Sequence, residues 1–116
     1  MKLSDKIIEV VEKEEFSIGE VGKQNEEYYV DINQYTPCGE DWWEVIWFDG
    51  TDKGFIKGVR ARYENFDVDE EVEPYIECRG ENGVPSSIKD LVEDGEWKKE
   101  KLGELKDELW LIEDEL

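Results

Sequence analysis

WWEVIWF, residues 42–48, is the stretch that decides the fold. It is apolar at every position except Glu44, which predicts the best-buried strand of a sheet. Two earlier stretches also read as strands, FSIGEV at 16–21 and YYVDINQY at 28–35. Because only short links separate the three strands, the sequence predicts an antiparallel meander.

Helical periodicity flanks this predicted sheet on both sides. Residues 4–14 place an apolar face between charged positions, and Ser4 is the expected N-cap. After a turn at 49–54, apolar residues recur at spacings of four, four and three, which predicts a middle helix with one buried stripe (Phe55, Val59, Tyr63 and Phe66).

The C-terminal third is also predicted to be helical. A short helix is expected at 69–78 and a loop at 79–85, while Ser87 with Asp90 resembles a capping box. Gly95 is expected to break the helix that follows. Beyond it, apolar residues repeat at three and four (Leu102, Leu105, Leu109, Ile112 and Leu116). The sequence thus predicts one α+β domain over 1–116: a three-stranded antiparallel sheet packed with an N-terminal and a middle helix, then a helical C-terminal third.

The composition is that of a folded and very acidic chain. Its 116 residues include 33 acidic and 14 basic side chains, for a net charge of −19, while five Trp, five Tyr and four Phe argue against disorder. Nucleic acid and anionic membranes have the same sign of charge and would repel the chain. The expected partners are basic proteins, above all those that bind nucleic acid, rather than nucleic acid or membrane itself.

The sequence predicts a cytoplasmic protein. No apolar run approaches the ~20 residues of a membrane span, and the amphipathic, acid-containing start at 1–15 does not resemble a signal peptide. Cys38 and Cys78 lie far apart and outside any C-x-x-C, which favours reduced thiols; a disulfide is the alternative.

Residue types that catalysis requires are scarce. Histidine is absent, and there is no P-loop, dinucleotide fingerprint, nucleophile elbow or zinc spacing. An EF-hand loop from Asp67 fails at Val72 and Cys78, where Gly and Glu are required. Glu44 is a conceivable buried acid, but the alternating pattern favours an outward-facing residue. We therefore expect no catalytic residue, no metal site, no cofactor and no enzymatic activity.

Aromatic residues gather in the second and third predicted strands. They would form either a base-stacking platform or part of the core (Tyr28, Tyr29, Trp42, Trp43 and Trp47). Single-strand binders combine such platforms with a positively charged groove. Because this chain has the opposite charge, core packing is favoured.

Basic residues form one run, Lys53 to Arg62, in which four bases stand among apolar or small neighbours. They either form a solvated helix face, which is favoured, or pair with the acids that follow.

Acidic residues are concentrated in two segments. Residues 64–81 hold eight acids and one base, and residues 88–116 hold eleven acids and five lysines. With a helical rise of ~1.5 Å per residue, the second segment carries about one carboxylate per 4 Å. A DNA strand carries one phosphate per ~3.4 Å, so the two densities are comparable. The candidate partner-binding residues are Asp67, Asp69, Glu70, Glu71, Glu73, Glu77, Glu93, Asp94, Glu104, Asp107 and Glu108. An inert solvated surface is the alternative.

The run from residue 66 to 96 resembles segments of small uncharacterised proteins of bacterial phages and conjugative elements. The resemblance covers at most residues 40–95 and is carried by an acidic start and a short downstream motif (Asp67, Asp69, Glu70, Tyr75, Ile76, Arg79, Gly80, Val84, Pro85, Ser86, Ser87 and Ile88). In size and acidity the chain is also similar, as a class, to anti-restriction and anti-CRISPR proteins.

Together these observations predict a non-enzymatic inhibitor that imitates DNA and binds the basic groove of a host nuclease or defence effector. The alternative is an assembly module whose C-terminal stripe at 102–116 pairs with a second copy as a homodimer. As core, the same stripe would instead pack on the sheet.

Overall fold

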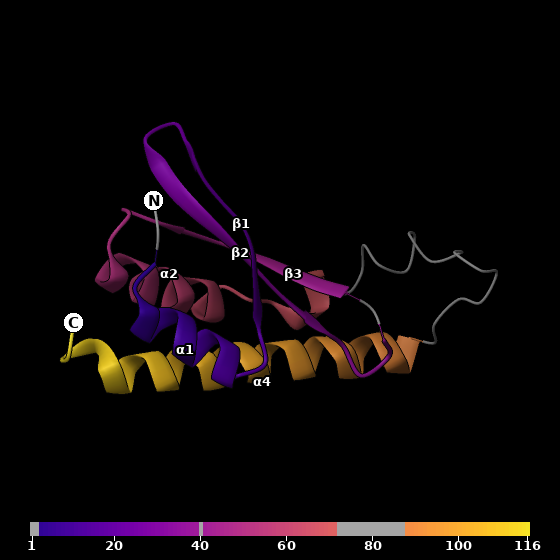
Figure 1. Cartoon of the computed structure of the whole chain (residues 1–116). Coiled ribbons are helices and arrows are strands. Elements are labelled where there is room, and N and C mark those ends of the chain that lie inside the picture. Colours follow the sequence, from indigo (N-terminus) through magenta and orange to yellow (C-terminus); the bar gives the residue numbers. More distant parts are fainter. Residues whose placement is uncertain (1–2, 40, 72–87) are drawn as a thin grey trace.

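The protein is an α+β fold, as the sequence predicts. The structure is a computed structural model that describes residues 3–39, 41–71 and 88–116. Its elements, in chain order, are α1 (Asp5–Lys13), β1 (Ser17–Gln24), β2 (Glu27–Tyr35), β3 (Asp41–Phe48), α2 (Asp52–Glu64) and α4 (Ile88–Glu113). Helices α1, α2 and α4 lie on one side of the sheet, and α4 runs along the base of the molecule (Figure 1).

The sheet is the expected antiparallel meander, with strand order β1-β2-β3. The link between β1 and β2 is a tight two-residue turn, in which Asn25 and Glu26 both have positive φ. This geometry matches the twist of paired strands, so the hairpin forms locally. The link from β2 to β3 is longer, and β3 is left at one edge of the sheet.

Strand β3 alternates strictly between a buried and an exposed face, which corrects the expectation of burial on both faces. Trp42, Glu44, Ile46 and Phe48 point inward, and the residues between them point outward. Trp43 is 54% exposed and Trp47 44%. The prediction that these two tryptophans belong to the core was therefore wrong, because the helices cover only one face of the sheet.

One core joins the sheet to the helices. Ser4 caps α1 by accepting a hydrogen bond from the Ile7 N–H at 3.3 Å, and Thr51 caps α2 in the same way through Gly54 at 2.9 Å. Both helices then direct apolar residues at the inner face of the sheet. The fully buried side chains are Ile7, Val11, Val30, Ile32, Trp42, Ile46, Phe55, Ile56, Val59, Leu102, Leu105 and Leu109.

Helix α4 is continuous through Gly95, so the predicted break there is wrong. Gly95 is buried, and packing of the helix against α1 and α2 offsets the low helix propensity of glycine. The predicted stripe packs inward, since Leu102, Leu105 and Leu109 are buried and Ile112 and Leu116 adjoin the core. A single helical turn occupies 68–71; the remainder of the predicted helix at 69–78, the loop at 79–85 and Ser87 lie outside the described residues.

At Gly58 the backbone of α2 lies close against β3. A Cβ added there would lie 2.6 Å from the Trp47 carbonyl oxygen and 2.7 Å from Ile46 Cγ2. We expect Gly58→Ala to lower the free energy of unfolding by about 1–3 kcal/mol, because the helix must move away from the strand. Urea denaturation measures this change.

Gly103→Ala is the matched control inside α4. Its new methyl meets only the edge of the Tyr63 ring, at 3.0 Å, and alanine has the higher helix propensity. We expect stability to be unchanged or slightly higher. Equal losses for the two variants would contradict the assigned close approach of α2 to β3.

Candidate functional site

The segment after α2 presents carboxylates on a fixed turn. Asp67 Oδ1 accepts the backbone N–H groups of Asp69 at 2.9 Å and Glu70 at 3.3 Å, as an N-cap does. Asp67, Asp69 and Glu70 are exposed. Their backbone is thus anchored while their side chains face solvent.

The exposed side of α4 lies next to this turn. Two shallow hollows adjoin each other there, and both are lined by Val68 and Lys99. One hollow takes its carboxylates from the end of α2 and the turn after it (Glu64, Asp67, Asp69 and Glu70), and the other takes them from α4 (Glu96, Glu100, Glu104 and Asp107). We call these eight carboxylates the acidic face. The two acidic segments of the sequence therefore meet on one surface.

Not every predicted residue belongs to the acidic face. Glu71 turns inward to Arg62. Glu108 and Glu93 line neither hollow and lie 3.2 Å from Lys13 and 3.9 Å from Lys89. Two predicted residues that do line the second hollow also have lysines nearby, since Glu104 lies 3.3 Å from Lys101 and Asp107 lies 3.5 Å from Lys106. Asp94 is only 4% exposed, so a surface partner cannot reach it, and we remove it from the set. Glu73 and Glu77 lie outside the described residues.

Three members of the acidic face, Glu64, Glu96 and Glu100, were not predicted individually. For Glu96 and Glu100 the available signal was their helical spacing relative to Glu104, since residues 96, 100, 104 and 107 follow one side of a helix. Glu64 lies in α2, and its place beside α4 follows only from the fold.

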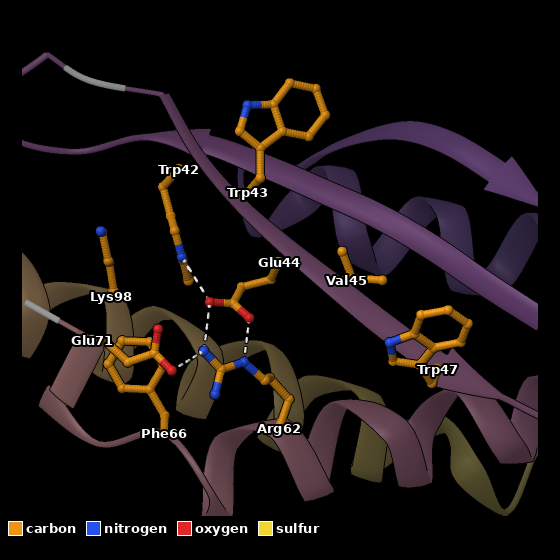
Figure 2. Close-up of a pocket in the computed structure, with 9 residues that line it drawn as sticks. All are labelled: Trp42, Trp43, Glu44, Val45, Trp47, Arg62, Phe66, Glu71 and Lys98. Carbon is orange, nitrogen blue, oxygen red and sulfur yellow. Dashed lines mark hydrogen bonds and ion pairs between the residues drawn. The ribbon is translucent and has the colours of Figure 1, made fainter. Parts of the chain in front are cut away.

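Glu44 faces the core, which corrects the outward orientation expected from the strand pattern. Its Oε1 accepts the Trp42 indole N–H at 3.0 Å and Arg62 Nη2 at 3.1 Å, and its Oε2 accepts Arg62 Nε. Arg62 Nη2 also donates to Glu71 at 2.9 Å, and the guanidinium lies over the Phe66 ring (Figure 2). Burial lowers the pKa of Arg62, but the hydrogen bonds and charges of Glu44 and Glu71 outweigh it, so the pKa is raised.

The basic residues between Lys53 and Arg62 thus fill both roles that the sequence allows, since two pair with acids and two face solvent. Arg62 pairs with Glu71, and Arg60 lies 3.9 Å from Glu113, as internal pairing predicts. Lys53 and Lys57 are exposed, as a solvated face predicts.

A pocket of about 410 Å³ opens beside this ion pair, at the edge of β3. Glu44, Arg62, Glu71 and the mostly buried Lys98 line its polar side, and the aromatic wall includes Trp43 and Trp47 (Figure 2). Because two carboxylates face two cations, the charges compensate, and none of the four is arranged as a free acid or base.

Within residues 3–39, 41–71 and 88–116, no group of three or more cysteine or carboxylate side chains is placed to hold a metal ion. No helix in the same part of the chain is long and apolar enough to cross a membrane.

Comparison with known proteins assigns no family to this arrangement. No family model, curated protein or solved structure matches the chain. The geometry of the described residues therefore carries the functional argument.

The outer face of the sheet is a second surface of note. Trp43, Val45 and Trp47 cross it on β3, and Tyr29 on β2 lies beside Trp47 with ring centroids 5.4 Å apart. Asp31 stands among them, and burial, followed by repulsion from Glu20, raises the pKa of its carboxyl group.

Replacing Glu44 by Ala is expected to destabilise the fold by about 3 kcal/mol, because it leaves the half-buried Arg62 without its main counter-charge. Glu71→Ala is the matched control, since Glu71 pairs with the same guanidinium but its side chain is 41% exposed. We expect it to cost less than about 1 kcal/mol. Chemical denaturation of both variants tests this; equal losses would contradict the central role of Glu44.

Asp31→Asn is expected to raise the unfolding temperature at neutral pH. The raised pKa means that the folded state holds a proton on Asp31 more tightly than the unfolded state, so the ionised form weakens the fold. This increase in unfolding temperature should shrink as the pH falls through the pKa that Asp31 has in the folded state. It should vanish below the pKa of Asp31 in the unfolded state, which is about 3.9.

Asp49→Asn is expected to change the unfolding temperature in the opposite direction. Hydrogen bonds from Thr51 lower the pKa of Asp49, so its ionised form stabilises the fold, and its replacement should lower the unfolding temperature at neutral pH. Thermal melts of both variants between neutral and acid pH measure the effects. If the difference in unfolding temperature between a variant and the wild type were the same at every pH in that range, the shifted pKa of the replaced residue would not be its cause.

Proposed function

We propose that this chain is a non-enzymatic acidic inhibitor that binds the positively charged nucleic-acid groove of a host defence protein in place of DNA. The observation that carries the proposal is the acidic face, where two acidic segments distant in sequence present eight carboxylates on one surface. A basic groove attracts such a surface through the same charges that attract phosphates.

The spacing of the carboxylates supports this proposal. On α4 they recur every three or four residues, which a rise of ~1.5 Å per residue converts to about 4.5–6 Å along the axis. The turn at 64–70 supplies a second row beside the first. Phosphates of a duplex likewise form two rows, each with a charge per ~3.4 Å. The acidic face thus resembles that arrangement, with a lower density of negative charge.

Rigidity supports it as well. A mimic must hold its charges in place, because ordering them on binding would cost conformational entropy. Helix α4 is held by its buried leucines, and the turn is held by the Asp67 cap.

The alternative, self-association through the C-terminal stripe, receives less support. Leu102, Leu105 and Leu109 are fully buried in the chain's own core, so a second copy could reach them only after α4 detached.

The test is a pull-down from bacterial lysate with a variant of the acidic face (Asp69→Asn, Glu70→Gln, Glu104→Gln and Asp107→Asn). We expect the wild type to capture a basic nucleic-acid-binding protein that the variant does not. Capture should weaken steeply with added salt, and duplex DNA should displace the chain, because both compete for the same charges.

The matched control removes the same number of charges elsewhere, on α1 and the β1–β2 hairpin (Glu9→Gln, Glu12→Gln, Glu26→Gln and Glu27→Gln), where all four residues are exposed. It should capture the same protein as the wild type. Mimicry would be refuted if both variants behaved alike or if DNA failed to compete.

A further inference from the structure

The outer face of the sheet carries aromatic rings that lie flat across the strands. A Cβ on Gly19 of β1 would stand 2.9 Å from Trp43 Cζ3, and one on Gly22 would collide with the Tyr29 ring. The two glycines therefore leave room for these rings to lie over β1. Together with Trp47 they form a broad aromatic surface that no helix covers in the described part of the chain.

The charge on this face is negative. Glu20 accepts the Tyr29 hydroxyl at 3.0 Å, and Asp31 lies between the aromatic rings without a cation among the described residues. The one basic residue of the three strands, Lys23, pairs with Tyr28 and lies over its ring at 5.3 Å, on the side of the sheet to which Phe48 points rather than on the outer face. Nucleic acid would be repelled here, and a second copy would place Asp31 and Glu20 against the same carboxylates. A cationic partner would relieve the repulsion between them.

The chain itself contains an example of the contact that such a partner would make. On the helical side, the guanidinium of Arg60 lies 3.8 Å from the centroid of the Trp110 ring, with the Glu113 carboxylate 3.9 Å from Arg60. Trp110 is 54% exposed, as is Trp43. An arginine on a tryptophan face beside a carboxylate is therefore stable at this level of exposure.

We propose that the outer face of the sheet binds an extended, arginine-rich segment of a partner protein. A strand rises about 3.3 Å per residue, so Trp43 and Trp47 stand about 13 Å apart along β3. Asp31 pairs with Val45 and so lies midway between them. Arginines at alternate positions of an extended segment match this spacing: two guanidinium groups stack on the tryptophans, and the one between them meets Asp31.

This site is independent of the acidic face, because the two share no residue. The partner segment is recognised by guanidinium stacking rather than by charge alone, which distinguishes arginine from lysine. An experiment can therefore refute the proposed inhibitory function and still show that this site binds arginine, or refute this site and leave the inhibitory function standing.

The test is an NMR titration with the peptide Arg-Gly-Arg-Gly-Arg at about 150 mM salt, where long-range charge effects are screened. We expect the indole signals of Trp43 and Trp47 to shift, while those of the buried Trp42 and the stacked Trp110 stay in place. Trp43→Thr/Trp47→Thr, which retains β-propensity, should weaken binding at least about tenfold. Lys-Gly-Lys-Gly-Lys should bind several-fold more weakly than the arginine peptide.

Trp110→Gln is the matched control and should bind the arginine peptide as the wild type does. Unchanged signals of Trp42 and Trp97 in each variant verify the fold. The proposal is wrong if the double variant binds as tightly as the wild type, if the lysine peptide or a Gln-Gly repeat binds equally well, or if no tryptophan signal shifts. A dimer that forms without peptide and is lost in the double variant would assign the face to a second copy instead.

Discussion

The buried ion pair between Glu44 and Arg62 determines which face of β3 becomes the core. Both faces of this strand are rich in apolar residues, so hydrophobic burial alone would accept either orientation. A shift of one residue would exchange the two faces and bring Trp43, Val45 and Trp47 inside. It would also expose Glu44 and leave Arg62 without its partner. The pair therefore selects one register, and the orientation of α2 and the exposure of the outer tryptophans follow from it.

Three basic residues of the chain connect α1 and α2 to the C-terminal part of the chain. Lys13 of α1 and Arg60 of α2 both reach carboxylates of α4, at Glu108 and Glu113, and Lys6 reaches Glu115. Exposed pairs of this kind contribute little individually, but these three place positive charges between elements. The excess of acids is left on the outside, which explains why the acidic face and the outer face of the sheet are both negative.

Much of the fold could be predicted from sequence because its signals are local. Strand alternation, helical spacing and the cap at Ser4 act within a few residues. The errors arose where a distant partner decides the outcome. Nothing near Glu44 in sequence indicates Arg62, and nothing near Asp94 indicates that its side of α4 is buried. Gly95 was misjudged for the same reason, since propensity ignores the packing that holds a helix together. The sequence showed that the two segments are acidic, but only the folded structure shows that they lie side by side and form the acidic face.

The order of elements along the chain also has a kinetic consequence. The meander and its hairpin turn join neighbours in sequence, so their contacts close short loops at little entropic cost. Helix α4, by contrast, packs against α1 and α2 from the far end of the chain. Its docking therefore carries most of the loop-closure entropy and belongs to the late part of folding. Until it docks, the surfaces of α1 and α2 that pack against α4 remain open to water, so a state of the chain that lacks α4 exposes apolar surface and is more prone to aggregate than the complete fold.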